Sequence, residues 1–172
     1  AQGYFCAAGV DEVGRGPLAG PVVCAAVILS LEEARRIPGI DDSKKLSPKK
    51  REQLAALIRE RARAWAVAEV SNEVIDEINI LQATRLCMKR AVEALEIGAD
   101  VVLVDGNMTL DIALPQRAFV KGDARIASIG AASILAKVHR DALMRAFAER
   151  YPGYGFERNA GYGTAAHIAA IR

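Results

Sequence analysis

The chain has 172 residues, of which 52% are hydrophobic and 26% charged, a length and balance that exclude a disordered protein and predict one domain over residues 1–172. Its formal net charge of +2 is too small to indicate a nucleic-acid-binding protein on that ground alone. No apolar run approaches the roughly 20 residues of a membrane span and no secretory leader is present, so we expect a cytoplasmic protein without membrane association.

The first part of the chain predicts a β-hairpin, a helix and a further strand. Two apolar runs, residues 4–13 and 21–30, flank the stretch "GRGPLAGP", which is typical of a turn between strands. After a polar loop, Ser47 and Pro48 supply an N-cap and a first-turn proline, so we expect a helix from there to about Arg63. The run "AWAVAEV" then predicts a third strand.

The rest of the chain adds two strands and two long helices. A helical pattern begins after Ser71 and stops at Gly98, and the buried type of strand follows in "DVVLVDG". The run "RAFVK" predicts a weaker fifth strand, residues 125–150 predict a helix, and a glycine- and aromatic-rich tail leads into a short helix. We therefore predict an α/β fold with a mixed five-stranded sheet flanked by helices, in which the fourth strand can pair parallel to the first.

Four acidic residues stand at strand ends or tight turns. Asp11 and Glu12 close the first strand, Asp105 closes the fourth, and Asp123 follows the fifth. Parallel neighbouring strands bring their carboxyl ends to one edge of a sheet, where ligands bind in open α/β folds. Clustered carboxylates repel one another unless a cation neutralises them, and a set without histidine or cysteine favours Mg²⁺ or Mn²⁺. Two such ions could support in-line hydrolysis of a phosphodiester.

Each acid also has a simpler interpretation. Asp105 before Gly106 and Asp123 after Gly122 could be turn formers, and Glu12 could be an exposed charge at a strand end. Adjacent residues on a regular strand point to opposite faces, so Asp11 and Glu12 could share a site only if the chain twists there.

A fifth acid, Asp141, competes with Asp123 for the fourth place in the set. It shares one face of the predicted helix with Ser133 and Lys137, which we include among the candidate substrate contacts. An ion pair with Lys137 or Arg145, one turn away, is the interpretation of Asp141 that we prefer.

Other candidate substrate contacts lie in loops. The turn of Gly14, Arg15 and Gly16 offers close backbone approach and a guanidinium for phosphate, although a plain hairpin turn would look the same. Lys44 and Lys45 could hold a nucleic-acid backbone or be solvated surface charges.

The aromatic, histidine and cysteine residues complete the search for site residues. Tyr154 and Tyr162 could stack on a sugar or base, or pack across their loops. The two histidines have no convincing catalytic partners. The three cysteines lack metal-ligand spacing and are predicted to be reduced packing residues.

Taken in order, the motifs "AGVDEVGRGPLAGPVV", "DSKKLS", "INILQATRLCMKRAV", "VLVDGN", "VKGDARIASIGAASILAKVHRD" and "GYGT" resemble those of bacterial ribonuclease HII, the type 2 ribonuclease H. The resemblance implies a ribonuclease H-like fold and metal-dependent hydrolysis of RNA in RNA/DNA hybrids and of single ribonucleotides embedded in duplex DNA. Cleavage would fall on the 5′ side of the ribonucleotide and leave 3′-hydroxyl and 5′-phosphate ends.

The resemblance also assigns roles to individual residues. It places the metal-binding acids at Asp11, Glu12, Asp105 and Asp123, and so favours Asp123 over Asp141. It implies that the Gly14–Gly16 turn recognises the 2′-hydroxyl and the adjacent phosphate, and that Tyr162 senses the ribose at an RNA–DNA junction. The 2′-hydroxyl is the group by which a protein distinguishes RNA from DNA at one position.

Two departures from the family pattern bear on substrate binding. Around Tyr162 this chain reads "NAGYG", where the family often has a lysine before the tyrosine and a proline after it. The sequence also ends at Arg172, before the family's usual C-terminal segment, so we expect that segment to be missing. Both departures predict weaker duplex binding outside the acidic cluster.

Two other function classes remain open at this point. A non-catalytic hybrid-binding domain would keep the fold and the basic loop, but clustered acids give a binder of a polyanion no advantage. Another nuclease of the same fold, such as a junction resolvase, would prefer branched DNA, which the "GRG" turn and Tyr162 argue against. We expect a monomer whose partners are RNA/DNA hybrids and ribonucleotide-containing duplex DNA.

Overall fold

A computed structural model describes residues 6–40 and 46–172. Five strands form one sheet in the order β3-β2-β1-β4-β5. β1 pairs antiparallel with β2 and parallel with β4, β2 pairs antiparallel with β3, and β4 pairs parallel with β5. This arrangement confirms the predicted mixed five-stranded sheet and its parallel first and fourth strands. The strands are β1 (Ala7–Val13), β2 (Val22–Ile28), β3 (Ala64–Val70), β4 (Val101–Asp105) and β5 (Gln116–Phe119).

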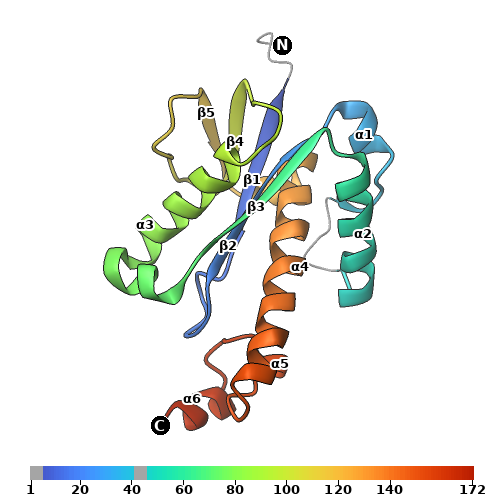
Figure 1. Ribbon diagram of the computed structural model, residues 1–172. Helices are drawn as coiled ribbons and strands as arrows, with labels where there is room; N and C mark the ends of the chain where they lie inside the picture. Colours follow the sequence, from blue (N-terminus) through green and yellow to red (C-terminus); the bar gives the residue numbers. More distant parts are fainter. Residues whose placement is uncertain (1–5, 41–45) are drawn as a thin grey trace.

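Helices cover both faces of the sheet (Figure 1). α3 packs on one face, and α4, backed by α2, packs on the other. α5 and α6 follow α4 and lie at the lower end of the molecule in Figure 1. The helices are α1 (Leu31–Arg35), α2 (Pro48–Arg61), α3 (Asn72–Glu93), α4 (Ala127–Arg150), α5 (Phe156–Asn159) and α6 (Ala165–Ile171), with one 3₁₀ turn, η2 (Gly122–Ala124).

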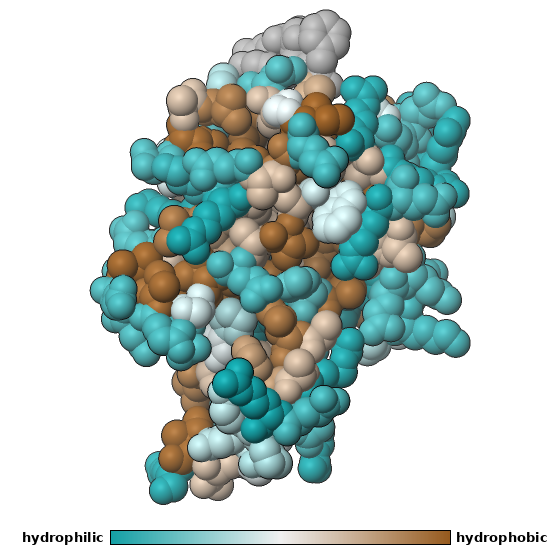
Figure 2. All heavy atoms as spheres, viewed as in Figure 1, coloured by the Kyte–Doolittle hydropathy of each residue, from teal (hydrophilic) through white to brown (hydrophobic). Residues whose placement is uncertain are grey.

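β2 is the strand around which the core is built, since every one of its residues is buried. Val22, Cys24 and Ala26 pack toward α3, whereas the alternate residues Val23 and Ala25 pack toward α2 and α4. The period of two in a strand divides the core into these two layers. By contrast α2 buries little of its own surface, and hydrophilic side chains gather on its side of the molecule, at the right of Figure 2.

β1 and α4 approach each other closely at Gly9. A Cβ atom on Gly9 would lie 2.2 Å from the Ser128 carbonyl carbon and 2.3 Å from the Ile129 nitrogen. Only glycine allows this approach. The contact seats the start of α4 against β1 and sets the distance between that helix and the carboxyl end of the strand.

The elements agree with the sequence pattern except at four places, one of which is the end of α3 at Glu93 rather than at Gly98. α1 was not predicted, although its capping box is complete: Ser30 Oγ accepts the Glu33 N–H at 3.1 Å and Glu33 accepts the Ser30 N–H at 2.6 Å. α5 forms within the tail that was predicted to be a loop. α3 is interrupted at Asn79, whose backbone has a φ of 67° and whose side chain caps the following turn.

Within residues 6–40 and 46–172, none of the helices combines the length and the hydropathy needed to cross a bilayer.

Candidate active site

A cavity of about 380 Å³ opens at the carboxyl ends of β1 and β4. It lies where the topology of an open α/β sheet places ligand sites. Three of the four predicted metal-binding acids line it, together with three of the predicted substrate contacts. The lining residues are Asp11, Glu12, Val13, Arg51, Asp105, Ser133, Ile134, Lys137 and Tyr162.

Asp11 and Glu12 both reach this cavity although they are adjacent on β1. The parallel ladder between β1 and β4 ends at the pair Val10 and Val104, so the two acids lie beyond the last residue pair that joins these two strands. The chain then leaves the strand at Gly14, whose φ is 106°. The strand end is therefore open toward Asp105, and side chains from either face of β1 can enter the same space.

The pKa values of Asp11 and Glu12 are both raised, first by burial and then by neighbouring carboxylates. Burial raises the pKa of Asp11 well above its usual range, and the charges of Glu12 and Asp105 raise it further, while a hydrogen bond from Ser133 lowers it. Burial also raises the pKa of Glu12; Arg15 lowers this pKa and Asp105 raises it. Both carboxyl groups are therefore harder to ionise than free acids, and a bound cation would favour their charged forms.

Asp105 is fixed by the turn that contains Asp123. Its Oδ1 atom accepts the backbone N–H groups of Gly122 at 2.7 Å and Asp123 at 3.2 Å. The Asp123 side chain is buried, with 4% exposure, and does not line the cavity. Asp123 also forms part of a tight turn, as its simpler interpretation predicted, because it lies within η2.

The acidic set fits a divalent cation by its chemistry. It offers carboxylate oxygens alone, its members repel one another, and the buried Oε2 atom of Glu12 has no hydrogen-bond partner in the part of the chain described. Oxygen donors of this kind suit Mg²⁺ or Mn²⁺. Among the described residues, no three acidic, histidine or cysteine side chains already stand at the spacing of a metal site.

Arg15 turns back toward the acids. Its Nη1 atom lies 3.5 Å from Glu12 Oε1, and its side chain is 42% exposed. In this arrangement the guanidinium partly neutralises Glu12. A phosphate that entered the cavity could compete with Glu12 for Arg15, because a guanidinium binds both groups in the same way.

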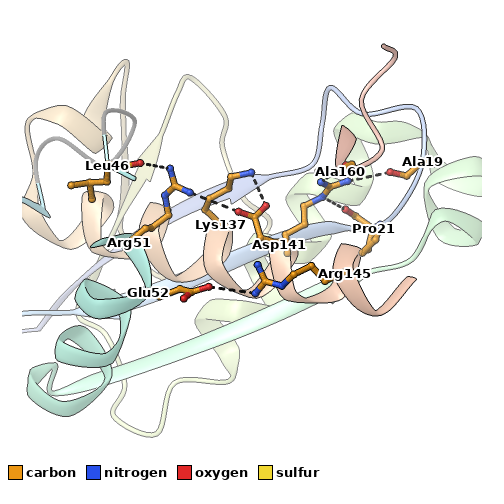
Figure 3. A network of polar contacts seen from close by, with 10 residues as sticks. Ala19, Pro21, Leu46, Arg51, Glu52, Lys137, Asp141, Arg145 and Ala160 are labelled. Atoms are coloured by element: carbon orange, nitrogen blue, oxygen red, sulfur yellow. Dashed lines mark hydrogen bonds and ion pairs between the residues drawn. The ribbon is translucent and has the colours of Figure 1, made fainter. Parts of the chain in front are cut away.

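The helix face predicted on α4 is present and borders the cavity. Lys137 Nζ donates to Asp141 Oδ1 at 2.7 Å, and Arg51 Nη1 lies 3.7 Å from Asp141 Oδ2 (Figure 3). The preferred pairing of Asp141 with Lys137 is confirmed. Arg145 instead pairs with Glu52 at 3.5 Å. Asp141 therefore holds two cations at the cavity rather than joining the acids.

Tyr162 lines the same cavity as the acids and lies next to the glycine turn. A Cβ atom on Gly16 would lie 3.5 Å from Tyr162 Cε1, and the tyrosine is 42% exposed. The backbone carbonyl of Tyr162 accepts a hydrogen bond from Nδ1 of the buried His167 at 2.9 Å. Tyr154 is not part of this cavity and stacks on Phe156, with ring centroids 5.6 Å apart.

The other predictions have mixed outcomes. Lys44 and Lys45 lie outside the described residues. The cysteines are free, and burial raises the pKa of the Cys24 thiol, as expected of a packing residue. His139 pairs with Glu69 at 2.6 Å, away from the acids.

Two arginines at this site were not predicted. Arg51, near the start of α2, lines the cavity although it was not among the candidate site residues. Arg140 is completely buried behind the Gly14 turn. Its burial could have been inferred from the helical spacing. Ala132, Ala136 and Met144 are buried at intervals of four residues, and Arg140 lies on the same face of the helix.

The chain is similar to known proteins over nearly its whole length. The ribonuclease HII family profile matches residues 8–172. Ribonuclease HII from Dechloromonas aromatica (strain RCB) is 62% identical over 169 residues, which cover 98% of this chain and 84% of that protein.

Two solved structures share the fold. The crystal structure of ribonuclease H2 from Pyrococcus horikoshii OT3 matches with a TM-score of 0.83 and 29% identity, over 95% of this chain and 83% of that one. RNase HII from Archaeoglobus fulgidus, solved in complex with PCNA, matches with a TM-score of 0.81 and 28% identity, over 97% and 86%. They confirm the expected ribonuclease H-like fold. By its sequence over nearly the whole chain and by its fold, this chain belongs to the ribonuclease HII family.

Proposed function

We propose that the cavity at the ends of β1 and β4 binds the phosphodiester on the 5′ side of a ribonucleotide and hydrolyses it. As a member of the ribonuclease HII family, the protein is an endoribonuclease that acts on RNA/DNA hybrids and on ribonucleotides embedded in DNA. The observation that carries the proposal is the convergence of Asp11, Glu12 and Asp105 in one cavity.

The proposed cofactor is Mg²⁺ or Mn²⁺, held by Asp11, Glu12 and Asp105, with Asp123 as the fourth ligand. When bound, such ions activate water and neutralise charge on the scissile phosphate. We assign the fourth ligand to Asp123 rather than to Asp141, because the Asp123 backbone N–H already donates a hydrogen bond to Asp105. Asp141 is engaged by Lys137 and Arg51.

The remaining lining residues orient the substrate in this proposal. Ser133 lines the cavity, where its hydroxyl lowers the pKa of the Asp11 carboxyl. Lys137 keeps a positive charge at the cavity wall, where a phosphate oxygen would approach. The exposed ring of Tyr162 lines the cavity and lies next to Gly16, and the proposed ribose space is the part of the cavity beside this pair, where a ribose and its 2′-hydroxyl would lie.

The reaction would break the bond between phosphorus and the 3′-oxygen of the preceding nucleotide. A water oxygen forms the new bond to phosphorus from the opposite side, in line with the leaving oxygen. The upstream fragment keeps a 3′-hydroxyl and the ribonucleotide keeps a 5′-phosphate. This outcome distinguishes the reaction from attack by the neighbouring 2′-hydroxyl, which would leave a 2′,3′-cyclic phosphate.

The proposal is tested with two matched DNA duplexes, one of which carries a single ribonucleotide. With Mg²⁺ or Mn²⁺, the wild type is expected to nick only the ribonucleotide duplex, and Asp11→Asn is expected to lose this activity while its far-ultraviolet circular dichroism stays unchanged. Full activity of Asp11→Asn would contradict the proposal. Salt-sensitive binding without any cleavage would support the hybrid-binding alternative, and preference for a four-way junction would support a resolvase.

We further propose a monomeric, single-domain enzyme that works in the cytoplasm, where a bacterial cell keeps its duplex DNA. Size-exclusion chromatography with light scattering would test the monomeric state, and a stable dimer would contradict it.

A further inference from the structure

Arg140 on α4 has no exposed surface, although its side chain carries a charge. A buried cation is unfavourable unless its donors are satisfied. Arg140 meets this requirement with three backbone carbonyls: Nε donates to Pro21 at 3.0 Å, Nη1 to Ala160 at 2.9 Å, and Nη2 to Ala19 at 3.1 Å (Figure 3).

These carbonyls belong to two loops that are far apart in the sequence. Ala19 and Pro21 lie in the loop between β1 and β2, which also contains the Gly14–Gly16 turn. Ala160 lies in the loop that carries Tyr162. The loops also touch directly, since the Leu18 N–H donates to the Gly161 carbonyl at 2.8 Å. One planar guanidinium therefore joins the two loops that border the proposed ribose space.

The loops fit tightly around this side chain. A Cβ atom on Gly14 would lie 2.7 Å from Arg140 Nε, and one on Gly20 would lie 3.2 Å from Nη2. A Cβ atom on Gly161 would lie 2.2 Å from the Ala19 carbonyl oxygen. All three glycines have positive φ angles, of 106°, 92° and 84°. Neither loop can shift far without losing these contacts.

We propose that Arg140 is a positioning residue that sets the distance between the Gly14–Gly16 turn and the Tyr162 ring, and thereby the selectivity for a ribose over a deoxyribose. The inference rests on the proposed function of that space. Arg140 does not line the cavity, so it acts through the loops and touches neither substrate nor acids. A lysine at this position would keep the charge, but an ammonium cannot reproduce the planar fork that reaches three carbonyls.

The experiment compares Arg140→Lys with Arg145→Lys. Arg145 lies on the same helix, and its side chain is 56% exposed and pairs only weakly with Glu52. Binding of the two matched duplexes is measured without divalent metal, and steady-state cleavage is measured with Mg²⁺. In Arg140→Lys we expect the preference for the ribonucleotide duplex in binding to fall by about tenfold or more, with KM rising more than kcat falls. Arg145→Lys should keep the wild-type preference.

A double-mutant cycle with Tyr162→Ala separates positioning from a general structural role. If Arg140 acts through the ring, Arg140→Lys should cause little further loss of preference once the ring is absent. An equal loss in both backgrounds, or an unchanged preference in Arg140→Lys, would overturn the inference. Should Arg140→Lys fail to fold, Gly161→Ala leaves Arg140 in place and pushes against Ala19. It is expected to reduce the preference in the same way, and an unchanged preference would equally overturn the inference.

The two readouts keep this inference distinct from the proposed function. A wild type that prefers the ribonucleotide duplex in binding but cannot cleave it would contradict the proposed reaction alone, and the binding data would still test Arg140. A wild type that binds both duplexes equally would overturn the inference, because there would be no ribose selectivity for Arg140 to set.

Discussion

The Asp105 carboxylate accepts a hydrogen bond from the Asp123 backbone N–H, at 3.2 Å. The same oxygen accepts the Gly122 N–H at 2.7 Å. A side chain at the end of β4 therefore fixes the start of η2, which follows β5. Through this pair, an acid that sequence spacing alone could not choose over Asp141 is held beside the acidic cavity.

Replacing Asp105 separates its two roles. Asp105→Asn keeps an oxygen that can accept both N–H groups, so we expect near-normal stability with loss of most activity. Asp105→Ala removes the acceptor and should lower the free energy of unfolding by about 1–3 kcal/mol in addition. Urea unfolding combined with the nicking assay checks this. Equal stability of the two variants would show that these hydrogen bonds do not hold η2.

Asp123→Asn and Asp141→Asn should differ in activity. We expect Asp123→Asn to lose at least about a hundredfold in cleavage rate, as a lost metal ligand would. Asp141→Asn should keep its response to Mg²⁺ concentration, because Asp141 pairs with Lys137 and Arg51. Cleavage rates measured over a Mg²⁺ titration decide between them. The opposite ranking would place Asp141 in the metal-binding set.

Asp11 should make the metal-free protein less stable at neutral pH. Its pKa in the folded state is raised by burial and by Glu12 and Asp105. The folded state therefore binds this proton more tightly than the unfolded state, and the stability it contributes is present below about pH 4, the unfolded pKa, and lost as pH rises through the folded pKa.

Asp11→Asn is accordingly expected to have a higher melting temperature than the wild type at pH 7. The increase should be roughly 2–4 °C for each kcal/mol gained by removing the buried negative charge. Thermal unfolding in a chelator between pH 4 and pH 8 measures the difference, which should disappear at the acidic end. Added Mg²⁺ should stabilise the wild type more than the variant. A variant that melts below the wild type at every pH would contradict the stated cause.

Gly9→Ala should be among the most destabilising changes in the chain. The new Cβ would meet the Ser128 backbone at 2.2 Å, so α4 would have to move off β1. We expect a loss of roughly 3 kcal/mol or more in the free energy of unfolding. Gly98→Ala is the matched control, because nothing lies within 4 Å of its Cβ position. Similar unfolding midpoints for the two variants would show that the helix tolerates displacement.

The sequence predicted the sheet and most of the acidic site because both follow from local patterns. Alternating and continuous apolar runs identify the strands, and acids at their carboxyl ends identify the edge. It left open how Asp11 and Glu12 enter one cavity, since that depends on where the pairing of β1 with β4 ends. No local pattern reports this register.

Other features depend on tertiary contacts that a linear pattern does not contain. Arg140 resembles any charged helical residue until the Gly14 and Gly161 loops close around it. Asp123 and Asp141 are equivalent as carboxylates, and the hydrogen bond to Asp105 distinguishes them. The break in α3 at Asn79 arises from a side-chain cap that competes with the helix.

The central claim is that the cavity hydrolyses a phosphodiester on the 5′ side of a ribonucleotide. The most direct measurement is product mapping of a DNA duplex that contains one ribonucleotide, with both ends of that strand labelled, after incubation with Mg²⁺. The claim predicts a single nick 5′ of the ribonucleotide, with a 3′-hydroxyl that a polymerase can extend and a 5′-phosphate on the ribonucleotide. A nick on the 3′ side, or a 2′,3′-cyclic phosphate end, would contradict it.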